Sequence, residues 1–390
     1  MKSVNLILGA CLLSITAING YSCKIDSKKT AGETLTAEAN LPKIKEQYVK
    51  IALLLDTSNS MDGLINQAKA HLWDVVNEFT YAKCGNDQRP LLQIALYEYG
   101  NDNLVAKEGY IRQVLGFSGD LDQISEKLFS LTTNGGEEFC GEVIHTSLQQ
   151  LNWGKNEDDL KLIFIAGNEP FTQGKFDYRD AVTNAKEKDV LVNTIFCGNY
   201  EQGVSTDWKN GALLTGGEYM AIDHNQQIVH IATPYDDIII QLNSQLNDTY
   251  VSYGSVGAQK KQLQSIQDTN AAKLQEDVAV KRAVSKSSRL YKNSEWDLVD
   301  AIAEESVTIE DIALEDLPAE LKGKSDDQIK TYIDIKKTER HRIQKEIQAL
   351  HVKREAYIAK KQQTEKGELE NAMLSAIKRQ AAQKKYIWEK

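Results

Sequence analysis

Apolar runs of strand length alternate with helical repeats from residue 49 to residue 222, and this alternation limits the possible folds more than any other feature. Ile51 to Leu55 is a continuous apolar run, which is typical of a strand buried on both faces. Apolar residues then recur at helical spacing from Ile65 to Phe79. Such alternation predicts a mainly parallel sheet with helices on both faces.

The same pattern continues along the chain. We expect further strands at 91–99, 111–117, 160–166, 190–196 and 219–222, and further helices at 121–128, 143–151, 178–185 and 208–214. Sheets of this kind bind ligands at the carboxyl ends of their strands. The predicted fold class is therefore α/β, with a doubly wound, mainly parallel sheet followed by an α-helical C-terminal region.

The first residues have the features of a targeting segment. Lys2 precedes an apolar run from Leu6 to Ile18, and small residues stand before Cys23. We expect a signal peptide at 1–22 and a polar linker at 23–47, in a protein that is secreted or lies in the periplasm or cell envelope. As an alternative, Cys23 directly after this segment could carry a lipid, which would make the protein a membrane-associated lipoprotein.

Charge is distributed unevenly over the 390 residues. The formal net charge is −10, which argues against a nucleic-acid-binding protein with a dominant basic face. Residues 321–390 contain 18 Lys or Arg and 10 Asp or Glu, a formal charge of +8, so the rest of the chain carries −18. The basic region could contact an anionic partner, fold onto the acidic part of its own chain, or form a solvated helix face.

Beyond an α/β domain at 48–250, residues 251–390 are helical in pattern. A heptad seam extends from Ile329 to Tyr357, and three of its nine positions are basic. Because an interrupted seam specifies partners poorly, we expect a helical hairpin within the chain, with its turn at Gly367. An intermolecular coiled coil, through which the tail would self-associate, is the alternative.

The pentad Asp56-Thr57-Ser58-Asn59-Ser60 stands directly after the first buried strand and before a helix. Its carboxylate and two hydroxyls, at alternate positions, can converge in a loop. Oxygen ligands of this kind suit hard divalent cations, above all Mg²⁺. The sequence contains no nucleophile elbow, phosphate-binding loop, dinucleotide fingerprint or zinc-protease helix, so we do not expect an enzyme.

The pentad resembles the start of the metal-ion-dependent adhesion site in von Willebrand factor type A (VWA) domains. Residues 212–219 also resemble the Thr-Gly-Gly turn before the last strand of these domains. The resemblance covers residues 48–245. It implies one antiparallel edge strand in the sheet, and binding of proteins through a metal whose coordination a partner carboxylate completes.

The family's site residues carry over in part. Asp56, Ser58 and Ser60 match its first loop. The second loop, which normally provides a Thr, has Glu137 at the aligned position, or Glu138 if the loop shifts, with Thr133 as a further candidate. The third loop has Gly in place of Asp, and Glu169 is the nearest acid. The ligands implied for Mg²⁺ or Ca²⁺ are Asp56, Ser58, Ser60, Glu137 and Glu169. If the site is vestigial, Glu137 would instead cap the following helix, where an acid near the N-terminus is stabilising.

Cys23, Cys84, Cys140 and Cys197 remain after the predicted signal peptide, and the sequence alone does not fix which of them would pair. In the family's topology Cys140 and Cys197 lie at the same edge of the sheet, which implies a disulfide between them in an oxidising compartment. Buried free thiols are the alternative.

These observations predict a metal-dependent protein-interaction or adhesion module in a secreted or cell-envelope protein of bacterial type. The first alternative is a structural envelope protein that self-associates and has a degenerate metal site. The second is a metal-dependent hydrolase that uses the same acidic pocket.

Overall fold

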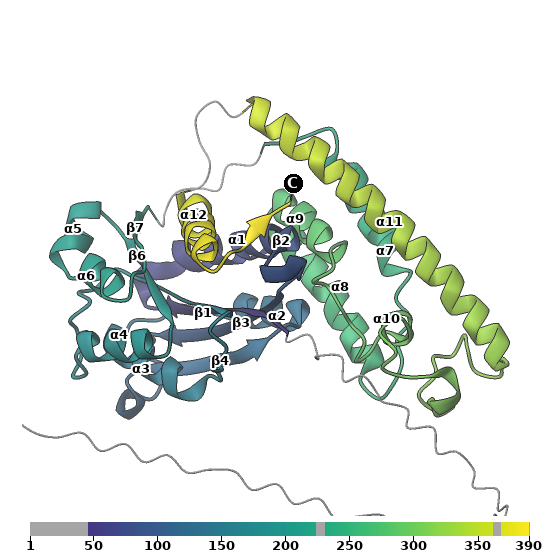
Figure 1. The fold of residues 1–390 in the computed structure, drawn as a ribbon, viewed down its shortest axis with the longest axis horizontal. Coiled ribbons are helices and arrows are strands. Elements are labelled where there is room, and N and C mark those ends of the chain that lie inside the picture. Colours follow the sequence, from purple (N-terminus) through teal and green to yellow (C-terminus); the bar gives the residue numbers. More distant parts are fainter. Residues whose placement is uncertain (1–45, 224–230, 362–367, 390) are drawn as a thin grey trace, which may run out of the picture. The chain divides into compact units, whose positions relative to one another are not determined.

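A computed structural model of the chain describes residues 46–223, 231–361 and 368–389, and its central feature is a six-stranded sheet. The sheet strands are β1 (Tyr48–Asp56), β3 (Leu91–Tyr99), β4 (Ile111–Ser118), β5 (Leu160–Gly167), β6 (Leu191–Cys197) and β7 (Tyr219–Ile222). Their order is β4-β3-β1-β5-β6-β7. The edge strand β4 is antiparallel to β3 and the other pairs are parallel, which confirms the predicted fold class (Figure 1).

Helices alternate with these strands and then continue without them. The α/β part contains α1 (Asp62–Thr80), α2 (Leu121–Phe129), α3 (Cys140–Gln150), α4 (Tyr178–Glu187), α5 (Tyr200–Ser205), α6 (Trp208–Leu213) and α7 (Asp236–Asn247). The C-terminal part contains α8 (Gly257–Leu274), α9 (Glu276–Lys286), α10 (Leu298–Ala303), α11 (Asp326–Lys361) and α12 (Glu368–Gln383).

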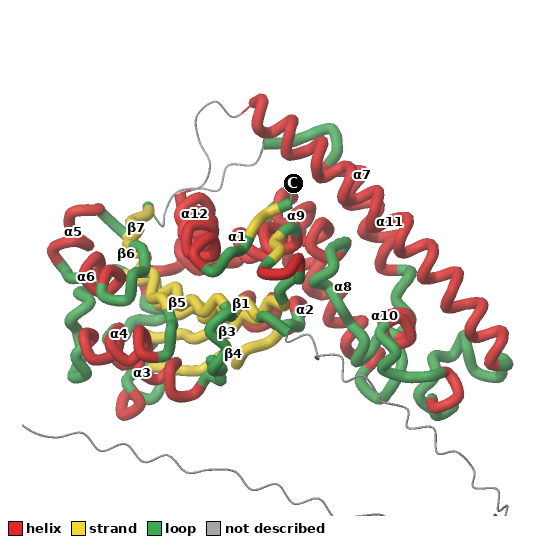
Figure 2. The backbone as a smooth tube through the Cα atoms, viewed as in Figure 1, coloured by secondary structure: helices red, strands yellow, loops and turns green. Residues whose placement is uncertain are grey.

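Strand β1 is apolar throughout because its side chains are buried on both sides of the sheet. Val49 and Ile51 belong to one core cluster, whereas Ala52 and Leu54 belong to the other. Helices α1, α2 and α12 contribute to the first cluster, and α3 and α4 contribute to the second. Figure 2 shows the strands lying between these two layers of helices. A continuous apolar run is what this double burial requires.

The helical region shares its core with the sheet. Val284 of α9, Ile347 of α11 and Ile377 of α12 belong to the same cluster as Val49 and Ile51 of β1. Residues 46–390 form one compact unit. The boundary at residue 250 therefore marks a change from alternating strands and helices to helices alone, without separating two cores.

The seam of α11 faces the chain's own helices, chiefly α7, α9 and α10. Its apolar members Ile343 and Ile347 are fully buried. Two of its three basic members, Arg340 and Arg354, are buried too and contact acids elsewhere in the chain, whereas Lys336 is partly buried and lies 3.9 Å from Glu339 of the same helix. Arg340 contacts Asp297 and Asp300 at 2.6 Å, and Arg354 contacts Asp236 and Asp277. The basic positions that interrupt the heptad pattern are thus ion-pair sites within the chain.

The expected helical hairpin is not formed by the described residues. Helix α12 packs against α1 and β7, whereas α11 packs against α7 and α9 (Figure 1). The reason is that Ala376 and Ile377 of α12 complete the core over the sheet, while α11 needs the acids of α7, α9 and α10 for its arginines. The expected turn at Gly367 lies outside the described residues.

After α12 the chain returns to the α/β part. Strand β8 (Ile387–Trp388) pairs antiparallel with β2 (Ala82–Lys83), which follows α1. This short ribbon fixes the C-terminal residues beside the end of α1, and no motif in the sequence predicted it.

Within the described residues, no helix has both the length and the apolar character to cross a membrane. The predicted signal peptide at 1–22 and the lipidation site at Cys23 lie outside those residues.

The buried arginines of α11 generate a prediction about stability. Arg340→Ala should lower the free energy of unfolding by about 3–5 kcal/mol, because it leaves Asp297 buried without its cation. Denaturant unfolding of the full chain measures this. Arg342→Ala is the matched control on the same helix. Its side chain is 57% exposed and pairs with Glu346, so it should cost about 0.5 kcal/mol or less. Equal losses in the two variants would contradict this account.

Candidate functional site

Asp56 is the last residue of β1, and its side chain is completely buried at the carboxyl end of the sheet. One carboxyl oxygen, Oδ1, accepts a hydrogen bond from the backbone N–H of Ser58 at 2.7 Å. The other oxygen, Oδ2, is buried and has no hydrogen-bond partner. Buried polar atoms are nearly always paired, so an orphaned carboxylate oxygen needs an explanation.

The pentad forms a tight turn next to this carboxyl. The Thr57 N–H donates to the Tyr99 carbonyl at 2.9 Å, which ties the turn to the neighbouring strand β3. The hydroxyls of Ser58 and Ser60 lie 3.3 Å apart. Ser58 is buried and Ser60 is exposed, so the two hydroxyls extend from the buried carboxyl towards the surface.

The second acid at this position is Glu138. It is 5% exposed, and its Oε2 atom is buried without a partner, as Asp56 Oδ2 is. Glu137, the residue aligned by sequence, is exposed. The assignment of Glu137 to the site is therefore corrected to Glu138. The reason is the close approach of two loops, since a Cβ on Gly136 would lie only 2.5 Å from the Gly100 carbonyl oxygen. That contact sets the register of the loop.

Two glycines make room for the paired carboxyls. A Cβ on Gly100 would lie 2.6 Å from Glu138 Cγ and 3.0 Å from Asp56 Oδ1. A Cβ on Gly167 would lie 2.5 Å from the Tyr99 hydroxyl and 3.2 Å from Asp56 Oδ2. An aspartate at 167, as the family's third loop would have, does not fit this arrangement. Glu138 reaches the same space from the second loop instead.

The electrostatics of the pair are unfavourable for two negative charges. Burial raises the pKa of Asp56 well above its usual range, and the charge of Glu138 raises it further. Burial also raises the pKa of Glu138, and the charge of Glu169 adds to this effect. No described Lys or Arg forms an ion pair with Asp56 or Glu138. The two carboxyls therefore lack a neutralising proton or cation.

The remaining predicted residues lie further out. Glu169 is exposed, and its carbonyl oxygen accepts from Trp208 Nε1 at 2.7 Å. Thr133 donates to the carboxylate of Asp62. The structure thus brings Asp56, Ser58, Ser60 and Glu138 together and leaves Glu169 at the edge.

Asn168 is a site residue that the sequence did not reveal. Its Nδ2 donates to Ser60 Oγ at 3.2 Å, while its Oδ1 is buried without a partner. Its one signal was its position next to Gly167, at the carboxyl end of a buried strand. Among the described residues, no three His, Cys, Asp or Glu side chains gather into a metal-binding group. A cation here would depend on two carboxylates together with hydroxyl oxygens.

The expected disulfide between Cys140 and Cys197 is absent, since both are buried free thiols in this structure. Cys140 belongs to the core cluster on the α3 side of the sheet, and Cys197 belongs to the cluster on the α1 side. The sheet therefore separates the two sulfurs, although both residues are near its carboxyl edge.

Comparison with known proteins agrees with this architecture. Residues 50–207 match the family model of the von Willebrand factor type A domain, so the chain carries a VWA domain. Domains of this family often mediate protein–protein interaction or adhesion. A search of the curated proteins gives no match.

Solved structures that match part of this chain share little sequence with it. Proximal thread matrix protein 1 from the mussel byssus is 14% identical, over 45% of this chain and 41% of that one, with a TM-score of 0.33. BatB from Bacteroides thetaiotaomicron is 16% identical, over 45% of this chain and 90% of BatB, with a TM-score of 0.34. The pilus adhesin SpaC from Lactobacillus rhamnosus GG is 14% identical, over 45% of this chain and 28% of SpaC, with a TM-score of 0.33. These likenesses support no statement about function, and the match spans less than half of the mussel protein.

The raised pKa of Asp56 gives a prediction about pH. The folded chain holds the Asp56 proton more tightly than the unfolded chain, so its contribution to stability is full at low pH and is lost as pH rises through the folded-state pKa. Asn at position 56 has no proton to lose in this pH range, so the stability of Asp56→Asn should not fall in this way as pH rises. In EDTA, the variant should be more stable than the wild type at pH 8, and the difference should vanish near about pH 3–4.

Thermal unfolding at several pH values measures this difference. Glu137→Gln is the matched control, because Glu137 is the exposed neighbour of the buried acid. If the unfolding temperatures of the wild type and Asp56→Asn changed in parallel with pH, Asp56 would not be a buried carboxyl with a raised pKa.

Proposed function

We propose that the VWA domain binds another protein through a divalent cation, Mg²⁺ or Ca²⁺, held by Asp56, Ser58, Ser60 and Glu138. The observation that carries the proposal is the pair of buried carboxyl oxygens, Asp56 Oδ2 and Glu138 Oε2, which lack hydrogen-bond partners. Both belong to side chains that are at least nine-tenths buried.

A hard cation matches what these residues offer. Mg²⁺ and Ca²⁺ take oxygen ligands from carboxylates, hydroxyls and water. Two carboxylates would balance the charge of the ion, and Ser58 and Ser60 supply hydroxyl oxygens on the open side. The glycines at 100 and 167 keep the space beside the carboxyls free of side-chain atoms. When bound, the cation supplies a coordination position to an oxygen of the partner.

The residues around Asp56 are poorly suited to catalysis. Cys140 and Cys197 are buried, and burial raises the pKa of each thiol well above its usual range, so neither is an activated nucleophile. No histidine occurs in residues 56–62, 100–105, 131–139 or 167–172, the segments that surround Asp56. Asp56 and Glu138 would serve as ligands rather than as an acid and a base. Binding is therefore the proposed role, and no enzymatic activity is proposed.

The setting of this module is proposed from the first 23 residues alone. The apolar run after Lys2 favours a secreted, periplasmic or cell-envelope protein, and Cys23 is a site for a lipid anchor. Self-association through α11 is not favoured, since its seam residues are buried by the chain's own helices.

Metal binding tests the proposal directly. Calorimetric titration of the full chain with Mg²⁺, Ca²⁺ and Mn²⁺ should show binding to one site. Asp56→Ala should abolish it, and Glu138→Ala should weaken it by more than about tenfold, the loss that even outer-sphere residues cause. Glu137→Ala is the matched control, since it removes an acid one residue away, and it should leave affinity nearly unchanged.

Two results would contradict the proposal. One is the absence of binding by the wild type at millimolar metal. The other is equal weakening by Glu138→Ala and Glu137→Ala, which would show that general negative charge rather than the buried pair attracts the ion.

A further inference from the structure

We propose that a cavity at the amino ends of β1 and β3 binds a small organic carboxylate with an apolar body, and that Arg289 anchors the carboxylate. The cavity lies at the opposite end of β1 from Asp56. This site is therefore separate from the proposed metal site and does not depend on it.

The cavity has the size and the mixed lining of a ligand site. Its volume is about 550 Å³, and small-molecule pockets commonly measure about 300–1,000 Å³. It lies between the sheet, where β1 and β3 begin and β4 ends, and the segment that follows α9. Its apolar wall suits a hydrocarbon body, and it is formed by Leu91, Leu92, Phe117 and Leu290.

Arg289 sets the chemistry of the cavity. It is half-buried, and it donates to the carbonyl oxygens of Phe79 and Pro90 at 3.0 Å. It also donates to the Thr80 carbonyl at 3.3 Å. These bonds fix the guanidinium at the end of α1, and they leave one unused N–H on each of its terminal nitrogens. A carboxylate can accept two N–H bonds from a guanidinium at once.

The charge of Arg289 lacks an acidic partner. Arg282, Arg340 and Arg354 each contact at least one described carboxylate. Among the described residues, Arg289 contacts none. Burial and the charge of Arg89 lower the pKa of Arg289 to about 10, so it is still a cation at neutral pH. A carboxylate in the cavity would supply the missing negative charge.

Asn293 is a second, independent indication of a ligand. It lines the same cavity and is 7% exposed. Its Oδ1 accepts from Trp296 Nε1 at 3.0 Å, which fixes the orientation of the amide, but its Nδ2 is buried without a hydrogen-bond partner. Buried polar atoms are nearly always paired. An acceptor oxygen of a ligand would satisfy this donor.

The charge balance of the cavity favours a monoanion. The charged residues of the lining are Asp120, Lys260, Arg289, Lys292, Glu295 and Glu304. Lys260 pairs with Asp120 at 2.6 Å. Lys292 pairs with Glu304 at the same distance. Glu295 is exposed, and its charge acts on Lys260. Arg289 is left to balance one negative charge, which a carboxylate carries, whereas a phosphate monoester carries about 1.5 to 2.

Three probes with the same hydrocarbon body test the inference: phenylbutyrate, its neutral amide phenylbutyramide, and phenylpropyl phosphate. Binding of each to the full chain is measured by equilibrium dialysis in EDTA, so that the proposed metal site plays no part. Phenylbutyrate should bind at least about tenfold more tightly than the amide, because its carboxylate forms charge-assisted hydrogen bonds. The phosphate should bind more weakly than phenylbutyrate.

Two arginine variants separate the anchor from general positive charge. Arg289→Gln should weaken binding of phenylbutyrate by at least about tenfold. Arg89→Gln is the matched control, because Arg89 acts on Arg289 through its charge but is 51% exposed and is not part of the cavity lining. It should bind phenylbutyrate nearly as the wild type does.

A third variant keeps the test decisive if Arg289→Gln does not fold, since Arg289 also holds the end of α1. Asn293→Asp has nearly the same shape and keeps the acceptor for Trp296, but it adds a negative charge to the lining. It should weaken binding of phenylbutyrate by at least about tenfold through like-charge repulsion.

The inference is overturned if phenylbutyrate does not bind at millimolar concentration, or if the amide or the phosphate binds as tightly as the acid. It is also overturned if Arg89→Gln weakens binding as much as Arg289→Gln does, or if Asn293→Asp binds as the wild type does. Failure of the proposed function is a separate result, because it appears only in the metal titration.

Discussion

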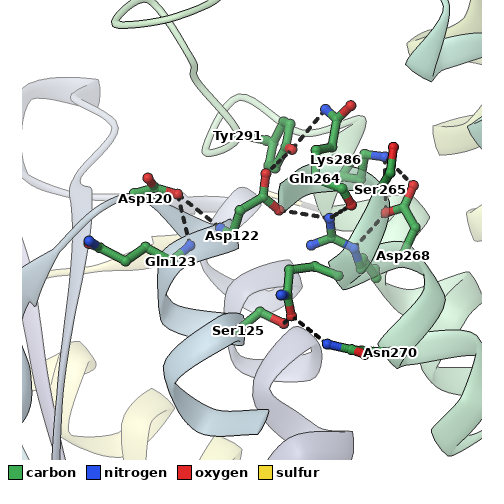
Figure 3. Close-up of polar contacts among 12 residues, drawn as sticks. Asp120, Asp122, Gln123, Ser125, Gln264, Ser265, Asp268, Asn270, Lys286 and Tyr291 are labelled. Carbon is green, nitrogen blue, oxygen red and sulfur yellow. Dashed lines mark hydrogen bonds and ion pairs between the residues drawn. The ribbon is translucent and has the colours of Figure 1, made fainter. Parts of the chain in front are cut away.

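The arrangement of this chain depends on buried arginines that hold the helical region on the α/β part. Arg282 of α9 is 1% exposed, and it contacts Asp122 of α2 at 2.7 Å and Asp268 of α8 at 2.6 Å. Figure 3 shows Asp122 also bonded to Tyr291, and Asp268 to Lys286. Removing one member of such a cluster leaves a buried charge without its partner, which costs far more than an exposed ion pair contributes. The helices therefore dock in one arrangement.

The candidate site has the opposite electrostatic design. The buried acids of the helical region are matched by Arg282, Arg340 or Arg354. Asp56 and Glu138 are equally buried, yet no described Lys or Arg pairs with them. The chain thus pairs the buried acids of its helical region with arginines, whereas Asp56 and Glu138 have no ion-pair partner among the described lysines and arginines. This contrast is the strongest physical support for a cation at the carboxyl edge of the sheet.

The sequence predicted the sheet well because double burial imposes continuous apolar runs, and a strand such as β1 has no other way to satisfy both faces. It also predicted that Asp56, Ser58 and Ser60 lie together in the turn after β1, since the turn after a buried strand is a local feature. Glu138 was the less favoured choice because the register of its loop depends on contact with Gly100, which is distant in sequence. Local sequence patterns likewise could not show whether Cys140 and Cys197 lie on the same face of the sheet. The hairpin prediction was wrong because the arginines of α11 are paired by acids far away in the chain.

The central claim is that Asp56 and Glu138 share one divalent cation. Anomalous diffraction from crystals of the chain grown with Mn²⁺ tests it most directly. The account predicts a single strong anomalous peak at the end of β1, bonded to carboxyl oxygens of both Asp56 and Glu138, with Glu137 pointing to solvent. A peak bonded to Glu137, or none near Asp56 at millimolar Mn²⁺, would contradict it.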